Sequence, residues 1–400
     1  MKKHIYCIIY SFIENENSAN EIQSKKTFEN LASLDNNIKG IFLGNKGSKR
    51  NPFWKIRKEN NKYFIDRFDF VNPYIEKLFK LGIIRKNIFP YLFAKRCQSI
   101  IRKDHFSKII YIRIASPEEG ICYIKNLKRL NIARIFFEMH NINYEISAFY
   151  RWSFENTYCK LAYKYFFELA RKNSDRVRII SLTRQLADII TSRLNIEKIN
   201  IVPSGHDFHI SQPKAVNFNK EKIEVIYVGF SFRYRDVEIL IQALNYLSDK
   251  FYLRMVGGGT SERENLRKKY HSLINQKKLL LGEPVAHFKI REKLFNADIA
   301  VISLPSTGFG YFTSPLKLFE YMSVGLPIIA SDTPCLREVL TKDSALFFKP
   351  GDNQDLANKI EYMARNEEEA KRISERAFRD SKKYTYFERA KKIYQLISRE

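Results

Sequence analysis

The residues whose types and spacing best suit chemistry lie together at 314–332, which reads SPLKLFEYMSVGLPIIASD. Ser314 is a favourable helix N-cap, and Pro315 suits the first turn of the helix that follows. The unpaired amides at such a helix start carry a partial positive charge and attract an anion, and Lys317 adds a full charge there. Glu320 lies about one and a half turns beyond Pro315, placed to contact a group further from the anion, such as a sugar hydroxyl.

The end of this stretch completes the element that positions those side chains. Thr313 is a second candidate for the cap. Gly325 ends the helix and Pro327 prevents its continuation. A buried strand over 327–331 follows, and Asp332 lies at its carboxyl end, where open α/β sheets bind ligands. Capping signals are common, so an ordinary capped helix packed on a sheet is the alternative that these residues leave open.

Short apolar runs separated by helical patterns recur along the chain. Continuous apolar runs indicate strands covered on both faces, and helices of about ten or more residues between them predict βαβ units and parallel sheets. The region 45–103 fits this rhythm less well. The expected strands are 5–10, 108–114, 134–140, 177–183 and 198–204, then 224–229, 252–257, 298–304, 327–331 and 345–349.

These two series of strands predict an α/β protein with two Rossmann-like domains, residues 1–207 and 208–384. The stretch 210–222 is polar, contains Pro213 and has no clear period, which is typical of a linker. The last helix, about 385–400, is expected to pack back on the first domain. A length of 400 residues agrees with two to three domains.

Charge is spread unevenly over the two halves. The net charge is +25, of which +18 falls in residues 1–200 (37 Lys and Arg against 19 Asp and Glu) and +7 in residues 201–400 (32 against 25). A basic half can bind nucleic acid, an anionic membrane surface or a phosphorylated substrate. Charge alone does not choose among these partners.

Cysteines and the N-terminus bear on the compartment. Five scattered cysteines without a CxxC pair argue against a disulfide framework and against zinc, and favour a reducing compartment with buried thiols. The N-terminal MKKHIYCIIYSFI has the basic start and apolar run of a signal peptide, but ENENSAN offers no clear cleavage site, and a first strand explains the run equally well. No run approaches the ~18 apolar residues of a spanning helix.

The stretch 314–332 resembles the nucleotide-sugar signature of retaining glycosyltransferases of family 4 (glycosyl transferases group 1), which have the GT-B fold. Members commonly read P-x-K-x-x-E-Y-M-A-x-G-x-P-V-V-A-S-D at this place. The likeness covers nearly all of 175–350, and is looser in NSANEIQSKKTFENL (17–31) and FEMHNIN (137–143). It includes YVGFSFRYRDVEILIQAL (227–244), RMVGGGTSERENL (254–266), LLGEPVAHFKIREKLFNADIAVISL (280–304) and INIVPSGHDF (199–208). The resemblance implies an acceptor domain and a donor domain whose parallel sheets face each other across a cleft.

The resemblance also implies donor-binding roles for matching residues. Glu320 is expected to hold the donor ribose, and the amides of Ser314 and Leu316 the diphosphate, with Lys317 nearby. Arg235 stands where the family usually has the Lys of a Lys-Gly pair, and an arginine binds phosphate through bidentate hydrogen bonds. Glycines let the backbone approach the donor at further expected positions, Gly229, Gly257, Gly258 and Gly310.

In the first half, the resemblance implies that His140 lies beside the donor phosphate and the reacting sugar, so that His140, Arg235 and Lys317 form the catalytic set. The alternative for His140 is a histidine of the core or of a loop whose ring nitrogens are hydrogen-bonded within the protein. His206 is expected to be structural. The loop after the first strand and the segment before the second domain are expected to meet the acceptor or line the cleft, through Ser18, Ala19 and Asn20 and through Gly205 and Asp207.

Two positions depart from the family pattern. Phe312 stands eight residues before Glu320, where members often have a glutamate that contacts the transferred sugar. The preceding stretch 303–314 must then handle the sugar differently, for example through amides at 308–310. Asp236 replaces the glycine of the Lys-Gly pair, which puts an acid beside Arg235.

The resemblance implies transfer of a sugar from a nucleoside diphosphate to a hydroxyl of a glycan or lipid-linked saccharide, with retention, in cell-surface polysaccharide or lipopolysaccharide synthesis. Preorganised cations stabilise the leaving diphosphate. No Asp-x-Asp motif occurs in a plausible metal-binding loop, so we expect metal independence and no cofactor beyond the donor substrate. The basic first half predicts an anionic partner, with 51–58 and 89–103 on a membrane surface; a solvated basic face is the alternative that these residues leave open. We expect a cytoplasmic protein at the inner face of a bacterial membrane.

Three other functions compete with this interpretation. A sugar-nucleotide epimerase on the same fold binds a donor but needs no acceptor. A donor-binding homologue with weak catalysis is favoured by Phe312 and Asp236. A nucleic-acid-binding protein agrees with the charge, but the charge is diffuse and no recognised nucleic-acid module is present.

Overall fold

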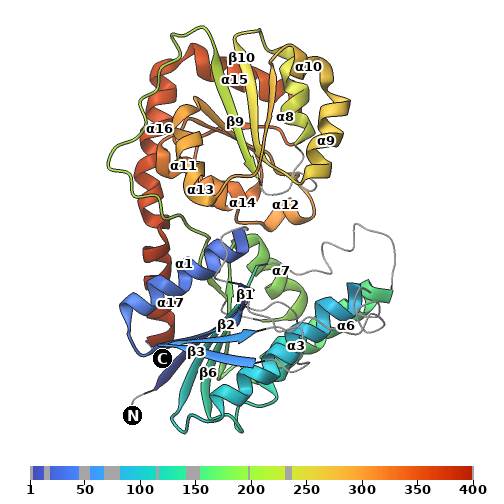
Figure 1. The fold of residues 1–400 in the computed structure, drawn as a ribbon, viewed down its shortest axis with the longest axis vertical. Helices are drawn as coiled ribbons and strands as arrows, with labels where there is room; N and C mark the ends of the chain where they lie inside the picture. Colours follow the sequence, from blue (N-terminus) through green and yellow to red (C-terminus); the bar gives the residue numbers. More distant parts are fainter. Residues whose placement is uncertain are drawn as a thin grey trace. The chain divides into compact units, whose positions relative to one another are not determined.

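The computed structural model describes residues 3–12, 19–44, 55–66, 82–113, 117–140, 154–196, 199–229 and 237–398. They form two compact α/β units (Figure 1). Unit 1 contains β1, Asn20–Val202 and the chain from Arg389 onward, and unit 2 contains Pro203–Glu388. The chain therefore changes unit after residues 202 and 388, whereas the sequence places the boundaries after 207 and 384.

Unit 1 is built on an eight-stranded sheet of order β3-β4-β2-β1-β5-β6-β7-β8. All neighbours are parallel except β3 and β4, which form an antiparallel hairpin at one edge. The strand order reverses between β1 and β5, the kind of place where open α/β sheets form a ligand crevice. The strands are β1 (His4–Phe12), β2 (Ile38–Gly44), β3 (Lys55–Glu59), β4 (Lys62–Asp66), β5 (Lys108–Arg113), β6 (Ile132–Met139), β7 (Val177–Ser181) and β8 (Asn200–Ile201).

Helices cover this sheet because its central strands are apolar on both faces. All six residues of β5 are buried. The C-terminal helix α17 (Tyr386–Ser398) contributes Ala390, Ile393 and Ile397 to the same core as Cys7 and Tyr111. The other helices are α1 (Ala19–Leu34), α3 (Gly82–Ile101), α4 (Pro117–Ile124), α6 (Phe154–Lys172) and α7 (Arg184–Leu194).

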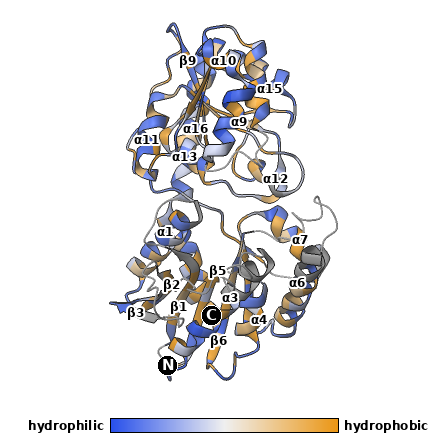
Figure 2. Ribbon diagram, turned by 45° about the vertical axis from the view of Figure 1, so that its right-hand side comes forward, coloured by the Kyte–Doolittle hydropathy of each residue, from blue (hydrophilic) through white to orange (hydrophobic). Residues whose placement is uncertain are grey.

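Unit 2 is built on a six-stranded, fully parallel sheet of order β11-β10-β9-β12-β13-β14. The strand order reverses between β9 and β12, so a second crevice is expected at their carboxyl ends. Apolar clusters lie on both faces of the sheet, and Figure 2 shows its strands coloured as hydrophobic. The strands are β9 (Ile223–Gly229), β10 (Phe251–Gly257), β11 (Leu279–Gly282), β12 (Ile299–Ile302), β13 (Ile328–Ser331) and β14 (Leu346–Phe348).

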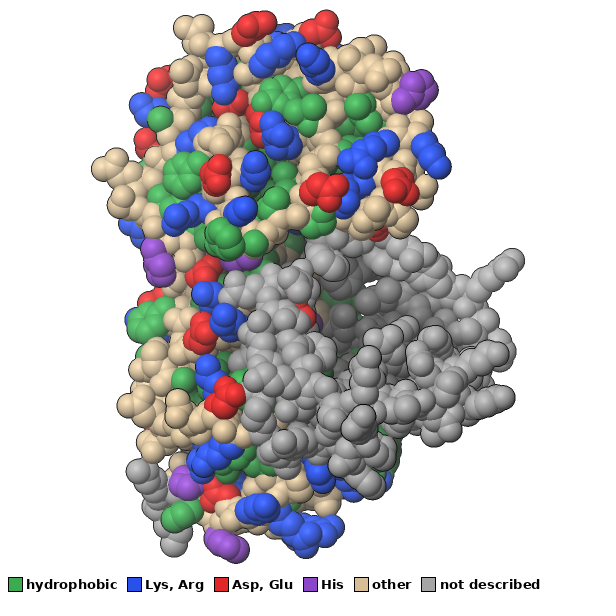
Figure 3. All heavy atoms as spheres, viewed as in Figure 1, with side chains coloured by type: hydrophobic (Ala, Val, Ile, Leu, Met, Phe, Trp, Pro, Cys, Tyr) green, Lys and Arg blue, Asp and Glu red, His purple; other side chains and the backbone are tan. Residues whose placement is uncertain are grey.

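The helices of unit 2 fill the connections between these strands. On the face seen in Figure 3, the outer side chains of unit 2 mix Lys and Arg with Asp and Glu. The helices are α8 (Glu238–Ala243), α9 (Thr260–Lys269), α10 (His271–Asn275), α11 (His287–Asn296), α12 (Phe309–Phe312), α13 (Leu316–Val324), α14 (Pro334–Arg337), α15 (Asn353–Arg365) and α16 (Glu367–Ser381).

The structure confirms the α/β class and the two parallel sheets. Each of the ten strands expected from the sequence overlaps an observed strand, and the expected linker 210–222 contains no helix or strand. The strands β2, β3, β4 and β11 were not among the expected runs. Across the described residues no helix combines the length and the apolar character needed to cross a membrane, and the four cysteines whose side chains are described are buried.

Candidate active site

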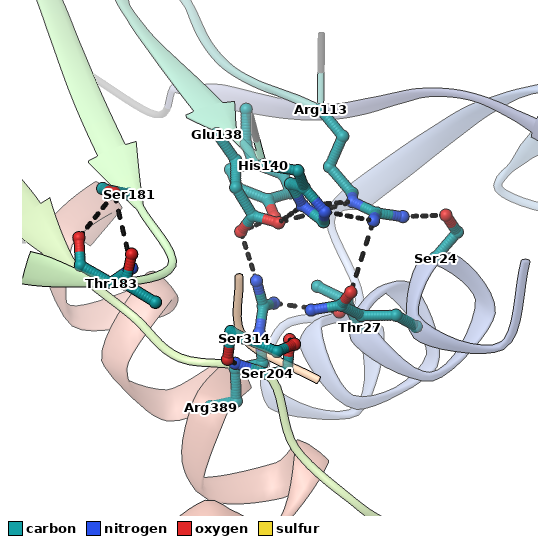
Figure 4. Close-up of polar contacts among 12 residues, drawn as sticks. Ser24, Thr27, Arg113, Glu138, His140, Ser181, Thr183, Ser204, Ser314 and Arg389 are labelled. Atoms are coloured by element: carbon teal, nitrogen blue, oxygen red, sulfur yellow. Dashed lines mark hydrogen bonds and ion pairs between the residues drawn. The ribbon is translucent and has the colours of Figure 1, made fainter. Parts of the chain in front are cut away.

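Helix α13 begins one residue later than its capping signal indicates. Its first residue is Leu316, and Pro315 is the N-cap without a side-chain hydrogen bond, so the prediction that Ser314 or Thr313 caps the helix is wrong. The Ser314 hydroxyl instead accepts a hydrogen bond from the amide of Ser204 at 3.1 Å, and the Ser204 hydroxyl donates to the Ser314 carbonyl at 2.9 Å (Figure 4). This contact diverts the Ser314 hydroxyl from capping the helix start.

Lys317 lies at the carboxyl end of β9, beside the point where the strand order of unit 2 reverses. Its Nζ is 3.7 Å from the centre of the Tyr227 ring, a cation–π distance. A Cβ added to Gly229 would lie 3.1 Å from the same Nζ. One turn on, the Tyr321 hydroxyl accepts a hydrogen bond from the amide of Val228 at 2.9 Å, which fixes α13 on the strand end. The lysine charge is thus placed where a parallel sheet binds ligands.

Glu320 is on the same side of α13 as Lys317, because residues three apart are neighbours on a helix. It is 7% exposed, and its Oε1 accepts a hydrogen bond from His287 Nε2 at 2.8 Å. His287 is the first residue of α11, and its ring stacks on Phe208 with 5.5 Å between ring centres. The spacing within 314–332 indicated Glu320 but gave no sign of His287.

The glycine-rich turn after β10 is shaped by contacts within the protein. Gly257 and Gly258 have positive φ values of 111° and 72°, and a Cβ on Gly257 would lie 2.1 Å from the Gly229 carbonyl oxygen. The amide of Gly258 donates to that carbonyl at 2.8 Å, and the amide of Gly259 donates to Glu262 at 2.8 Å. These two amides are therefore engaged within the protein, and donor contacts by Gly257 and Gly258 stay predictions.

Arg263 holds the other side of this turn and was not indicated by the sequence. Its side chain is buried, and Nη1 donates to the carbonyls of Gly257 at 3.4 Å and Gly258 at 2.5 Å. Nη2 pairs with Glu283 at 3.1 Å. A buried guanidinium thus holds the carbonyls of Gly257 and Gly258 in place.

Phe312, one of the two positions that depart from the family pattern, lies in the region before α13. Phe312 is only 2% exposed, so the position where relatives often have a glutamate contributes to the core instead. Gly310 has no room for a side chain, since a Cβ would lie 2.3 Å from the Pro305 carbonyl oxygen. The Cys335 thiol donates to the Gly310 carbonyl at 3.1 Å. Donor contacts by Gly310 stay a prediction.

The segment before unit 2's first strand packs on the end of α16. A Cβ on Gly205 would lie 2.6 Å from the carbonyl oxygen of Tyr384. The amide of His206 donates to that carbonyl at 3.0 Å, and its ring Nε2 donates to the Ser381 carbonyl at 3.1 Å. Burial lowers the pKa of His206, which keeps the ring neutral and agrees with a structural role. The roles of Gly205 and Asp207 toward an acceptor stay predictions.

In unit 1, His140 follows β6 and belongs to a buried charge network (Figure 4). Its Nε2 donates to Glu138 Oε1 at 2.6 Å, and Arg113 Nη2 donates to its Nδ1 at 3.2 Å. Glu138, which is fully buried, also accepts from the Tyr111 hydroxyl at 2.6 Å and pairs with Arg389 of α17. Arg113 also pairs with Glu138 Oε1 at 3.3 Å.

This network connects the carboxyl ends of β5 and β6 to α1 and α17. Arg113 donates to the hydroxyl of Ser24, and Arg389 donates to the hydroxyl of Thr27 at 2.9 Å. Both partners lie on α1. The sequence indicated His140 alone, and the strand-end positions of Arg113 and Glu138 were its only further signal.

The charges set the protonation states of this network. Burial would raise the pKa of Glu138, but Arg389, His140 and Arg113 together hold it well below its usual range. Burial and the charge of Arg113 lower the pKa of His140 to about 4, although Glu138 opposes them. His140 is therefore neutral near pH 7, with both ring nitrogens engaged inside unit 1. Its catalytic role stays a prediction.

Other predicted residues lie outside the description or differ from expectation. Arg235, Asp236 and Ser18 lie outside the described residues. Asn20 lies in the first turn of α1, not in a loop after the first strand, because the helix begins at Ala19. Within the described ranges, no three His, Cys, Asp or Glu side chains converge as metal ligands. Metal independence stays a prediction.

Comparison with known structures identifies the fold. The chain is similar to sucrose-phosphate synthase from Thermosynechococcus elongatus, with a TM-score of 0.73 at 17% identity over 98% of each chain. It is also similar to HepE from Anabaena in complex with UDP, with a TM-score of 0.67 at 11% identity over 99% of this chain and 100% of the other. At such identities the likeness shows the fold, and the GT-B fold is confirmed.

A second comparison concerns unit 2. Residues 209–380, less than half of the chain, match the family Glycosyl transferases group 1. A curated relative, the O-antigen chain mannosyltransferase RfbU of Salmonella typhimurium, is 22% identical over 201 residues. That match covers 50% of this chain and 54% of the relative, so it spans about half the length of each.

Proposed function

We propose that this protein transfers a sugar from a nucleoside diphosphate to a hydroxyl of a glycan or lipid-linked saccharide, with retention at the anomeric carbon, in cell-surface polysaccharide or lipopolysaccharide synthesis. The group 1 domain and the mannosyltransferase relative support the reaction and its setting. The single observation that carries the proposal is the placement of Lys317 and Glu320 on one side of α13, with the lysine charge at the carboxyl end of β9.

In this proposal α13 binds the nucleotide. The diphosphate lies at the helix start, where the amides of Ser314 and Leu316 and the charge of Lys317 attract it. Glu320 accepts a hydrogen bond from a ribose hydroxyl, and Arg235 adds a second cation. The complex of an Anabaena neighbour with UDP supports a nucleoside diphosphate as the ligand.

The chemistry then follows from charge development on the leaving group. The bond between the anomeric carbon and the diphosphate oxygen breaks, the acceptor oxygen bonds to the same carbon, and the acceptor's proton passes to the leaving phosphate. Lys317 and the helix start stabilise the charge that develops on the diphosphate, and such preorganised groups contribute about 10²–10³ in rate each. With cations in this place, we propose that no metal ion is needed.

For the acceptor side, we propose that unit 1 meets an anionic membrane surface through α3, α6 and the turn after α4. Helix α4 packs against both α3 and α6. The exposed residues on these elements, which we call the basic-aromatic face, include Lys95, Arg96, Lys125, Lys160, Lys164, Tyr91, Leu161 and Tyr165. The Lys95 ammonium lies 5.5 Å from the centre of the Tyr91 ring, and Lys125 lies 5.0 Å from that of Tyr165.

This composition fits an anionic lipid surface. Cations attract the headgroups, and exposed aromatic rings suit the interface between headgroups and chains. We therefore propose that the protein acts at the inner face of a bacterial membrane, where a lipid-linked acceptor is found.

A ligand screen tests the donor site. Thermal unfolding is measured with UDP, GDP, ADP and their common sugar conjugates. We expect at least one nucleoside diphosphate to raise the melting temperature of the wild type, and Glu320→Ala to abolish that shift. Failure of every nucleotide to stabilise the protein would contradict a donor site.

A transfer assay separates the transferase from an epimerase. The stabilising nucleotide sugar is supplied with and without saccharide acceptors, and products are separated by mass and by sugar identity. A transferase forms a glycoside only with acceptor, and an epimerase converts the sugar without one. Unchanged activity with a chelator is expected, and loss that magnesium restores would contradict metal independence.

Vesicle binding tests the basic-aromatic face. Co-sedimentation is measured with phosphatidylcholine vesicles, with and without phosphatidylglycerol. Lys160→Glu/Lys164→Glu is expected to weaken binding to the anionic vesicles, since each cation near such a surface contributes about 1 kcal/mol. The matched control Arg267→Glu/Lys268→Glu changes the same charge on α9. Equal loss in both variants would contradict a specific face.

A further inference from the structure

Glu320 and His287 form a closely held pair within unit 2. Their side chains are 9% and 10% exposed, and Nε2 of the histidine lies 2.8 Å from Oε1 of the glutamate. The pair joins the first residue of α11 to the second turn of α13, two helices that pack together. A buried carboxylate needs such a partner, because an ionised group without one is costly inside a protein.

The histidine is itself fixed from the other side. Its ring stacks on Phe208 with an interplanar angle of 29°, and Phe208 is 8% exposed. The imidazole is thus held between an aromatic ring and a carboxylate. A ring that cannot turn donates its hydrogen bond in one direction, so Oε1 has one preferred position.

Fixing Oε1 also fixes the second carboxylate oxygen. Oε2 of Glu320 makes no hydrogen bond to any group in the described part of the chain. Because a carboxylate is planar, the bond at Oε1 restricts rotation and sets the direction in which Oε2 accepts. One oxygen is therefore committed to the protein and the other is available to a ligand hydroxyl.

We propose that His287 is a positioning residue that aims Glu320 at the ribose of the nucleotide, and that it thereby sets a preference for ribonucleotides over deoxyribonucleotides. This inference rests on the proposed nucleotide site. A site built to bond a hydroxyl rejects the analogue that lacks it, because its buried polar group is then left unpaired. Without His287, Glu320 rotates and the two classes of nucleotide bind more alike.

The test is the affinity ratio between ribo and deoxyribo ligands, measured by calorimetric titration of the full chain. The probes are UDP, 2′-deoxy-UDP and 3′-deoxy-UDP, or the guanosine set if only GDP stabilises the wild type. The variants are His287→Leu, which removes the donor, and His287→Gln, which keeps an N–H donor. Glu320→Ala and the double variant Glu320→Ala/His287→Leu complete the cycle.

We expect His287→Leu to weaken binding of UDP about tenfold, the effect of losing a hydrogen bond to a charged group, and to leave at least one deoxy form unchanged. His287→Gln should retain most of the ratio between the affinities for UDP and for its deoxy forms. In the Glu320→Ala background, His287→Leu should change nothing further, because its effect acts through the carboxylate.

Two results would overturn the inference while the proposed function stands: equal weakening of all three ligands by His287→Leu, which indicates a structural role alone, or no weakening at all while Glu320→Ala still weakens UDP. Thermal unfolding of each variant identifies a folding defect. If His287→Leu does not fold, the affinity ratio measured for His287→Gln replaces it as the test. If no nucleoside diphosphate binds the wild type, the proposed function fails and this inference fails with it.

Discussion

Each unit of the molecule contains a buried glutamate bonded to a histidine, and the two pairs differ in how many partners the glutamate has. In unit 1, Glu138 contacts His140 at 2.6 Å and is also bonded by Tyr111, Arg113 and Arg389. In unit 2, Glu320 has a single side-chain partner, His287, within the described residues.

We infer that this difference separates a structural network from a group that binds a ligand. Fully satisfied buried networks stabilise one arrangement of the fold, and removing a member leaves the others uncompensated. A carboxylate with one oxygen uncommitted has bonding capacity left for a ligand. We infer that charge in unit 1 mainly holds β5, β6, α1 and α17 together, and that charge on α13 mainly serves the nucleotide.

The largest effect is expected from a substitution that breaks the unit 1 network. Glu138→Ala leaves the guanidinium groups of Arg113 and Arg389 buried without their anion, so we expect unit 1 to lose about 3–5 kcal/mol of stability. Hydrogen exchange in β5 and β6 measures that loss. Glu320→Ala is the matched control and should cost unit 2 clearly less, because it leaves only one histidine behind. Equal losses would contradict the comparison.

In unit 2, Lys317→Met should lower activity and leave the stability nearly unchanged. We expect the transfer rate to fall about 10²–10³-fold, since the substitution removes one charge that faces the leaving diphosphate. Lys371→Met, an exposed lysine of α16, is the control and should leave the rate unchanged. Steady-state kinetics and thermal unfolding are measured together. A Lys317→Met protein that unfolds early but keeps its rate would contradict the assignment.

Low pH is expected to destabilise unit 1 through His140, which adds to the contrast between the two units. Its pKa is lowered to about 4 in the folded chain, while the unfolded chain has the ordinary value of 6.5. The unfolded state therefore binds more protons in this window, and unit 1 loses stability as pH falls from about 6.5 toward 4. Between pH 7 and pH 5 the loss is about 1–2 kcal/mol.

The groups that face His140 keep their charge in this window. The pKa of Glu138 lies well below its usual range, and Arg113 and Arg389 remain protonated. His140→Gln should therefore flatten the dependence between pH 7 and pH 5, as followed by urea unfolding of β5 and β6. The same slope in wild type and variant would assign the acid sensitivity to other groups.

The smallest effect concerns the start of α13. Ser204→Ala removes the hydroxyl that donates to the Ser314 carbonyl, and we expect a loss of about 1 kcal/mol in unit 2. Thermal unfolding detects this change. A displaced helix start should also weaken nucleotide binding slightly, whereas the control Ser99→Ala on α3 should alter neither quantity. Ser204→Ala with wild-type stability would show that this contact does not fix the helix start.

Much of the fold was predictable because buried parallel strands have continuous apolar sequences. The central residues of β5 and most residues of β9 are apolar, and both strands were found within a residue or two of their bounds. The β3–β4 hairpin was missed because KIRKE and KYFID are charged sequences at a sheet edge, where burial on both faces is not required. β2 was missed at IKGIFLG, where Gly40 interrupts the run to make room for the rings of Phe28 and Phe42.

The site divides in the same way. The placement of Lys317 and Glu320 on one helix was predictable because their spacing is visible in nineteen consecutive residues. His287 and Arg389 were not, because their glutamate partners lie 33 and 251 residues away in the sequence and only folding brings them together. The cap at Ser314 failed for the same reason, since Ser204, 110 residues away, competes for its hydroxyl.

The most direct test of the central claim is hydrogen exchange of the full chain with and without saturating nucleoside diphosphate, starting with UDP. The account predicts slower exchange at the start of α13 and at the carboxyl end of β9, with no comparable change in β5 or β6. Saturable binding that leaves the amides of 316–324 unchanged, or that protects unit 1 alone, would contradict a nucleotide site on α13.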